Sequence, residues 1–120
     1  MLRMTVFVRR AEGLTHDEFL HHWRTVHGPL IANTPGLAQH IVRYEQHALA
    51  EVPDWAGTPG YDGMAVQWFE TFDGFLGFLQ DPAYAELIAP DEDRLLQKDK
   101  VLWLFTEDPV VVIDGDGSGA

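Results

Sequence analysis

Two short segments of the sequence are apolar on both of the faces that a β-strand presents. They are residues 64–70, MAVQWFE, and residues 101–107, VLWLFTE. Successive side chains of a strand point to opposite faces, so a strand with one solvated face alternates between apolar and polar residues. These two segments therefore predict strands that are covered on both sides, in a sheet that needs two covering layers.

Two further strands and two helical regions complete a predicted order of β, α, β, β, α, β. Residues 3–9 alternate with a period of two, and residues 37–47 predict a more polar strand at a sheet edge. Residues 17–27 predict a first helix, and residues 72–96 predict helical turns that restart at Asp81-Pro82 and break at Pro90. This order is typical of a ferredoxin-like α+β fold, a four-stranded antiparallel sheet with both helices on one face.

Such helices cover one face of the sheet, and the chain has no further layer for the other face. Burial against the same face of a second copy is the most economical solution, since a two-fold symmetric contact pairs like surfaces. We therefore expect a homodimer in which two sheets face each other and form a dimeric α+β barrel.

The first predicted helix has recognisable ends and an unusual apolar stripe. Thr15 and Glu18 have the spacing of a capping box, and Gly28-Pro29 predicts the end of the helix. The stripe consists of Phe19, Trp23, Val26 and His27, with Leu30 just beyond the predicted end. A histidine within an apolar stripe is the most chemically suggestive feature of the sequence.

Size and charge limit the classes of function. A chain of 120 residues is enough for one domain, which we expect to span residues 1–113, followed by a disordered tail at 114–120. Residues 48–63 form a long connection rich in glycine and proline, a kind of loop that is often functional. The sequence has no cysteine, no signal-peptide pattern and no membrane-length apolar run, so we expect a cytoplasmic protein without membrane association.

The net charge argues against polyanionic partners. Eight basic residues stand against 19 acidic ones, which gives a formal charge of −11, and the acids are spread along the chain. Proteins that bind nucleic acids show a basic footprint, which this sequence lacks. A small, mostly uncharged molecule is the partner that we expect.

The sequence between Gly13 and Leu30 resembles the EthD domain, a family of dimeric α+β barrel proteins. The resemblance rests on the pattern F-x-x-x-W-x-x-x-H-x-P-L, formed here by Phe19, Trp23, His27, Pro29 and Leu30 after Leu14. Weaker matches are Arg43-Tyr44, Asp62-Gly63-Met64-Ala65, Trp68-Phe69 and the acidic pair Asp91-Glu92. The chain departs from the usual pattern in its long loop before residue 64 and in its extra histidines, His21, His22, His40 and His47.

The resemblance implies a range of activities and does not select one. Relatives degrade ethers and other organic compounds, isomerise lactones, or decarboxylate or oxidise polyketide-like aromatics, and many are labelled oxidoreductases. The leading hypothesis is a small cofactor-independent enzyme, an oxidoreductase or a lyase or isomerase, that acts by acid/base chemistry on a hydrophobic oxygenated molecule. One alternative is a non-catalytic binding or accessory protein for an oxidase system. Another is haem binding through a helix histidine, as in some barrel relatives.

His27, His40 and Tyr44 are the candidate catalytic residues. His27 would be the general acid or base, a role for which histidine is suited near neutral pH. Its alternative role is a hydrogen bond to a loop carbonyl that fixes the Gly28-Pro29 turn. His40 and Tyr44 lie four residues apart on the predicted strand 37–47 and so point to the same side, where they would assist His27. Alternatively, they form an edge-strand pair at the dimer contact.

The aromatic residues are expected mainly in the core, with some lining an apolar substrate cavity. The candidates for substrate binding are Trp23, Trp68, Phe69 and Trp103. The sequence contains no H-E-x-x-H motif, no histidine pair at i, i+4 on the first helix, and no glycine-rich phosphate loop. We therefore expect neither a metal site nor a nucleotide cofactor.

Overall fold

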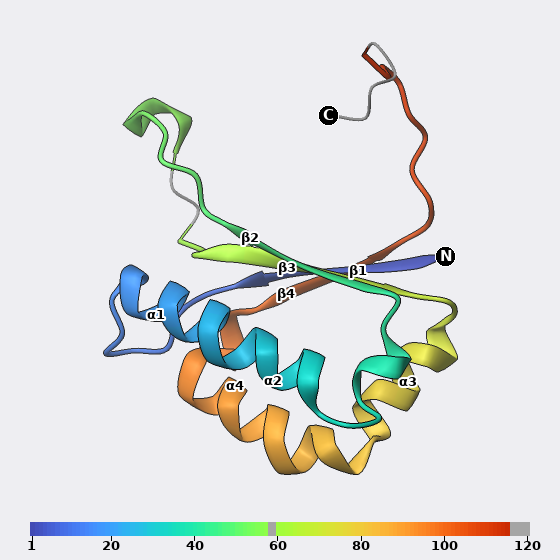
Figure 1. Ribbon diagram of the computed structural model, residues 1–120. Coiled ribbons are helices and arrows are strands. Elements are labelled where there is room, and N and C mark those ends of the chain that lie inside the picture. Colours follow the sequence, from blue (N-terminus) through green and yellow to red (C-terminus); the bar gives the residue numbers. More distant parts are fainter. Residues whose placement is uncertain (58–59, 116–120) are drawn as a thin grey trace.

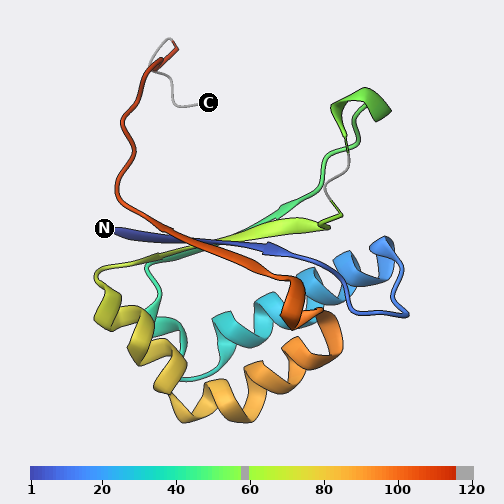
Figure 2. The same cartoon turned by 180° about the vertical axis from the view of Figure 1, so that it is seen from behind.

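The computed structural model describes residues 1–57 and 60–115 (Figure 1). Four antiparallel strands form one sheet in the order β2-β3-β1-β4. The strands are β1, Leu2–Val8; β2, Arg43–Ala48; β3, Gly63–Phe69; and β4, Leu102–Thr106. The helices pack on one face of this sheet in both views (Figures 1 and 2). The predicted ferredoxin-like α+β fold is thus confirmed, including the edge position of β2.

The first helical region is longer than predicted. It runs through α1 (His16–His22), a wider π turn η1 (Trp23–His27) and α2 (Gly28–Asn33). Its start is confirmed, because Thr15 and Glu18 form the expected capping box. The predicted end at Gly28-Pro29 is wrong, because Gly28 has ordinary right-handed helical angles and Pro29 is accommodated at the start of α2.

The π turn explains how the helix passes this proline. The buried positions follow a spacing of four throughout, at Phe19, Trp23, His27 and Ile31. On a regular α-helix, such a series would rotate by about 40° at each step, so a wider turn is needed to keep it on one side. Val26, expected on the stripe, is consequently 43% exposed.

The second helical region repeats this arrangement. It contains α3 (Phe72–Gln80), a second π turn η4 (Tyr84–Ile88) and α4 (Ala89–Leu95). The predicted break at Pro90 is wrong for the same reason as at Pro29, since a π turn directly precedes the helical segment that holds each proline. Both long helical regions therefore carry a local widening in mid-course.

The predicted second strand is too long at its start. A short 3₁₀ turn, η2 (Ala38–His40), precedes β2, and the ladder to β3 begins only at Arg43. Two more 3₁₀ turns are η3 (Asp54–Ala56) and η5 (Lys98–Lys100). Among the described residues, no helix is long and apolar enough to cross a membrane.

Two segments rise from the sheet on the side away from the helices (Figures 1 and 2). One is the connection between β2 and β3, where Trp55 is 87% exposed, and the other is the chain after β4, where Val110 is 89% exposed. Most of the predicted disordered tail, residues 116–120, lies outside the described residues, as do residues 58–59 of the connection.

Candidate active site

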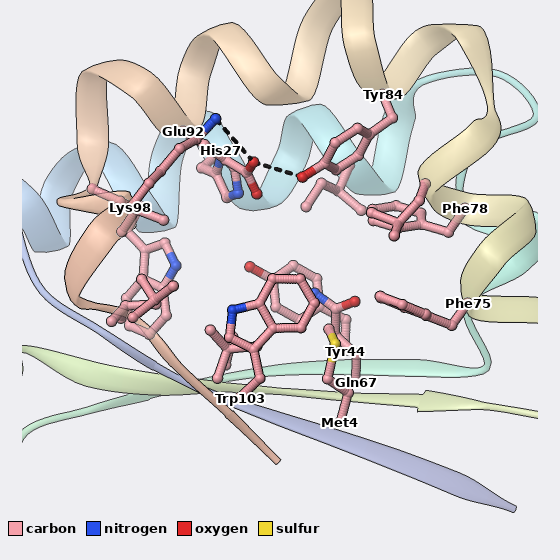
Figure 3. Close-up of a pocket in the computed structure, with 18 residues that line it drawn as sticks. Met4, His27, Tyr44, Gln67, Phe75, Phe78, Tyr84, Glu92, Lys98 and Trp103 are labelled. Carbon is pink, nitrogen blue, oxygen red and sulfur yellow. Dashed lines mark hydrogen bonds and ion pairs between the residues drawn. The ribbon is translucent and has the colours of Figure 1, made fainter. Parts of the chain in front are cut away.

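A cavity of about 320 Å³ lies between the sheet and the two helical regions (Figure 3). The sheet forms its floor, and the helices supply the facing walls. Apolar side chains make up most of the lining, with a few polar groups among them. The floor consists of Met4, Val6, Val8, Tyr44, Ala65, Gln67 and Trp103, and the walls include Trp23, His27, Ile31, Phe75, Phe78, Leu79, Tyr84 and Glu92.

His27 lines this cavity and is joined to a buried carboxylate. The Nδ1 atom of His27 lies 2.8 Å from Oδ2 of Asp91 on α4. His27 is 5% exposed and Asp91 is 2% exposed, so water has little access to the pair. A charge-assisted hydrogen bond in such surroundings fixes the orientation of the imidazole ring.

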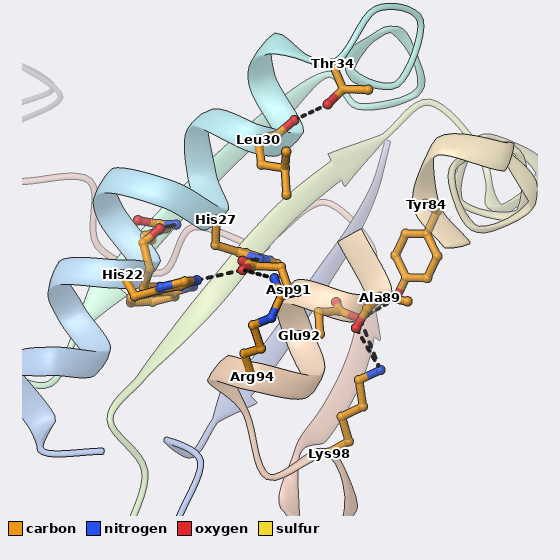
Figure 4. A network of polar contacts seen from close by, with 12 residues as sticks. His22, His27, Leu30, Thr34, Tyr84, Ala89, Asp91, Glu92, Arg94 and Lys98 are labelled. Atoms are coloured by element: carbon orange, nitrogen blue, oxygen red, sulfur yellow. Dashed lines mark hydrogen bonds and ion pairs between the residues drawn. The ribbon is translucent and has the colours of Figure 1, made fainter. Parts of the chain in front are cut away.

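The second oxygen of Asp91 contacts a second histidine (Figure 4). Nε2 of His22 lies 2.6 Å from Oδ1 of Asp91, and Nη1 of Arg94 is 4.0 Å from the same oxygen. The side chain of His22 is 32% exposed. Asp91 therefore connects a solvent-accessible imidazole with one that faces the cavity.

These contacts determine which nitrogen of His27 carries a proton. Burial opposes ionisation of Asp91, but the hydrogen bonds from His22 and His27 outweigh it and hold the pKa of this carboxyl below its ordinary value. An ionised carboxylate only accepts hydrogen bonds, so Nδ1 of His27 must donate. In the neutral imidazole, Nε2 is then the unprotonated nitrogen and is available as a base toward the cavity.

The two π turns bring these residues together. His27 is the last residue of η1, and Asp91 follows η4 by three positions. Gln46 of β2 secures the first turn, since its Nε2 donates to the backbone oxygen of Trp23 at 2.9 Å. A Cβ atom on Gly28 would lie 3.0 Å from that amide nitrogen, so close packing against β2 explains this glycine.

Tyr44 supplies a hydroxyl group from the floor of the cavity. Its oxygen accepts a hydrogen bond from Nε2 of Gln46 at 3.1 Å, which leaves the phenolic proton free to be donated. Burial raises the pKa of Tyr44 to about 12, despite the opposing effect of the Gln46 hydrogen bond. Tyr44 is therefore a neutral donor throughout the physiological pH range.

A second polar group lies on the helical wall (Figures 3 and 4). The hydroxyl of Tyr84 donates to Oε1 of Glu92 at 2.7 Å, and Nζ of Lys98 lies 3.8 Å from the same oxygen. Burial, followed by the charge of Glu92, raises the pKa of Tyr84. Lys98 also contacts Asp93 at 2.8 Å, so its charge is compensated by two carboxylates.

Four of the seven predicted site residues line the cavity, namely His27, Tyr44, Trp23 and Trp103. The expectation that His40 shares a strand face with Tyr44 is wrong, because His40 belongs to η2 and lies outside the cavity lining. Its Nε2 is 3.1 Å from Oδ2 of Asp81, and its ring packs against Gly77 of α3. The structure thus separates His40 from the other two catalytic candidates.

Two of the aromatic candidates also lie outside the cavity lining. Trp68 is on the opposite face of the sheet, where the guanidinium groups of Arg3 and Arg43 lie 5.2 and 5.6 Å from the centre of its ring. Phe69 is fully buried in the core beside Phe75. Neither reaches the space that Trp23 and Trp103 border.

Several polar residues of the site were absent from the sequence-based candidates, although one signal was visible. Tyr84, Ile88, Asp91 and Leu95 follow one another at spacings of four, three and four, which places Asp91 on the buried stripe of its helix. Gln67 likewise interrupts the apolar residues of β3 that face the helices. No group of three or more His, Asp or Glu side chains among the described residues is arranged to hold a metal ion.

Comparisons with known proteins agree with the architecture. The family model described as the EthD domain matches residues 11–99. An EthD family protein from Bacillus halodurans superposes with a TM-score of 0.67 at 13% identity, covering 91% of this chain and 99% of that chain. No curated protein matches the sequence.

Two further solved structures share the fold. A dimeric ferredoxin-like protein of unknown function from Thermobifida fusca has a TM-score of 0.63 at 17% identity and covers 88% of both chains. The hydroxynitrile lyase from Passiflora edulis has a TM-score of 0.60 at 18% identity, covering 88% of this chain and 90% of that chain. At these identities, the similarity concerns the fold.

Proposed function

The chain belongs to the EthD family, and on that premise we propose that it is an enzyme that enolises a hydrophobic carbonyl compound. The observation that carries the proposal is the His27–Asp91 pair at the wall of an apolar cavity. The pair presents an oriented, unprotonated imidazole nitrogen to whatever fills that cavity. Active sites commonly combine burial, a perturbed carboxylate and a histidine in this way.

In the proposed reaction, His27 removes a proton from the carbon next to the carbonyl group. The proton moves to Nε2, the electrons of the C–H bond form a C=C bond, and the carbonyl oxygen takes up the negative charge. The hydroxyl of Tyr44 donates a hydrogen bond to that oxygen, and Asp91 stabilises the imidazolium that has formed. Return of the proton at another position gives isomerisation, and loss of a leaving group gives a lyase reaction.

The surroundings of the pair support a hydrophobic, oxygenated substrate. Trp23, Phe75 and Trp103 border the cavity, and a volume of about 320 Å³ suits a small aromatic or polyketide-like molecule. The burial of His27 and Asp91 strengthens their electrostatic effect on the reacting atoms. The name of one structural neighbour, a hydroxynitrile lyase, supports small-molecule chemistry in this fold. His40 has no part in this proposal.

We further propose that the working form is a homodimer joined through the open face of the sheet. On that face, Leu102 and Leu104 are 55% and 57% exposed, and Trp68 lies nearby on β3. The two segments that rise beyond this face flank the space that a second sheet would occupy (Figure 1). Neighbouring structures described as dimeric support the same arrangement.

Deuterium exchange of β-tetralone tests the proposed step without knowledge of the natural substrate. This bicyclic aromatic ketone loses its acidic C–H signal in D₂O when it is enolised, and NMR follows the loss. We expect the wild-type protein to accelerate the exchange above the buffer rate. His27→Gln should lower the acceleration by about 10²–10⁴-fold, the usual contribution of a general base.

His21→Gln is the matched control, because His21 lies on the exposed side of α1. It should exchange β-tetralone at the wild-type rate. Equal rates in the wild-type protein and His27→Gln would overturn the assignment of His27. Tight binding of β-tetralone with no exchange above buffer would instead identify a non-catalytic binding protein.

A further inference from the structure

Gln67 is a buried polar residue that the proposed reaction does not use. It lies in the inner strand β3, paired in register with Met4 on one side and Tyr44 on the other. Its side chain points toward the helices and lines the cavity between Trp103 and Phe75 (Figure 3). Gln67 is 7% exposed.

The oxygen of this side chain has no hydrogen-bond partner. Among the described residues, no donor reaches Oε1 of Gln67, and the atom is shielded from solvent. An unpaired buried acceptor destabilises the folded protein, and an apolar residue of similar shape would avoid that cost. A ligand that donates the missing hydrogen bond would explain why such an acceptor is buried here.

We infer that Gln67 selects ligands that carry a hydroxyl donor, a phenol or an enol, and that its Oε1 accepts the hydrogen bond. The inference rests on the proposed function, since it concerns the substrate of the same cavity. Tyr44 is the neighbouring donor on the floor, so the two residues together fit a molecule with both a carbonyl oxygen and a hydroxyl group. An unpaired polar group of the protein rejects an analogue that lacks the matching partner.

A matched pair of probes tests the inference by binding alone. β-Naphthol and β-naphthyl methyl ether share a ring system, but only the naphthol donates a hydrogen bond. We expect the wild-type protein to bind β-naphthol about 5- to 100-fold more tightly, as measured by calorimetry. Equal dissociation constants for the two probes would overturn the inference.

Variants assign the preference to Gln67. Methionine has a shape similar to glutamine but no amide, so Gln67→Met should bind both probes alike. Gln80→Met changes an exposed glutamine on α3 and should keep the wild-type ratio of the two dissociation constants. The ligand-free Gln67→Met protein should also have a higher Tm, because the unpaired oxygen is gone. A preference for β-naphthol that persists in Gln67→Met would contradict the inference.

Two observations separate this inference from the proposed reaction. Tyr44→Phe and His27→Gln should both retain the preference for β-naphthol, because neither change removes Oε1 of Gln67. The side-chain amide signals of Gln67 in NMR spectra should shift with β-naphthol and not with the ether. If His27→Gln lost the preference and the Gln67 signals did not shift, the hydroxyl group of β-naphthol would bond to His27 instead of Gln67. That result would overturn the inference.

Discussion

Nδ1 of His27 lies 2.8 Å from Oδ2 of Asp91, although the two residues are 64 positions apart in the chain. Each belongs to a helical region that carries a π turn, and the two regions meet over the sheet (Figure 4). The contact fixes the ring orientation of a histidine on an apolar stripe, which we propose to be the base.

Asp91→Asn should lower both activity and stability. The amide cannot accept two charge-assisted hydrogen bonds as the carboxylate does, so the free energy of unfolding should fall by about 1–3 kcal/mol. The rate of β-tetralone exchange should fall by about 10- to 1,000-fold, because a general base that has lost its orientation loses part or most of its contribution to the rate. Urea denaturation and NMR measure the two effects.

His22→Gln serves as the control for that variant. A glutamine amide can still donate to Oδ1 of Asp91, and the contact with His27 through Oδ2 remains. The exchange rate should stay within a few-fold of the wild-type rate. A loss as large as that of Asp91→Asn would show that the outer histidine takes part in proton transfer.

The stability contributed by Asp91 should disappear in acid. Its pKa is lowered in the folded protein by His22 and His27 against the effect of burial, and Arg94 is the other charged group nearby. A lowered carboxyl pKa gives stability that is fully present above the ordinary value of about 4 and is lost as the pH falls through the folded-state value. The pKa of Asp62 is also lowered, but Asp62 is present in both proteins. Its contribution to the pH dependence of stability therefore cancels when the two proteins are compared.

Urea titrations of the wild-type protein and Asp91→Asn between pH 7 and about pH 3 measure this contribution. The difference in unfolding free energy should shrink as the pH falls below about pH 4, where the carboxyl of Asp91 takes up a proton. A difference that grows as the pH falls would contradict the assigned direction of the shift.

Tyr44→Phe should slow the exchange of β-tetralone while leaving the fold intact. Gln46 keeps its hydrogen bond to the backbone of Trp23, so the π turn remains supported. Loss of a donor to the developing enolate oxygen costs about 10²–10³-fold in comparable sites. Because the pKa of Tyr44 is raised to about 12, the wild-type rate should show no loss from tyrosine ionisation up to about pH 10.

Leu104→Glu should convert the proposed dimer into monomers. Leu104 is 57% exposed on the open sheet face, in the middle of the edge strand β4, where the proposed dimer would bury a carboxylate without a partner. Leu87→Glu is the control, since Leu87 is 42% exposed on the helical side. Sedimentation velocity measures both, and a Leu104→Glu protein that sediments like the wild-type protein would contradict the proposed interface.

The sequence predicted the fold better than the site. Strands with two apolar faces and a capping box are local patterns, and the structure contains both the strands and the capping box. The helix ends were missed because a proline normally ends an α-helix, whereas here a π turn accommodates it.

Asp91 was missed as a partner of His27 for a different reason. Its position on a buried stripe was readable from the spacing, but the pairing of two distant helices depends on how both pack against the sheet. The same limit applies to Gln67, whose lack of a partner is a property of the whole cavity. Patterns in the sequence identify polar residues on buried faces, and only the assembled core shows what they contact.

The tautomer of His27 tests most directly whether this residue can act as the base. Long-range ¹H–¹⁵N NMR spectra of the wild-type protein, recorded at a pH where the ring is neutral, distinguish the two imidazole nitrogens. We predict a proton on Nδ1, donated to Asp91, and an unprotonated Nε2 toward the cavity. A proton on Nε2 with an unprotonated Nδ1 would contradict it, because the ring would then have no base to offer to a bound substrate.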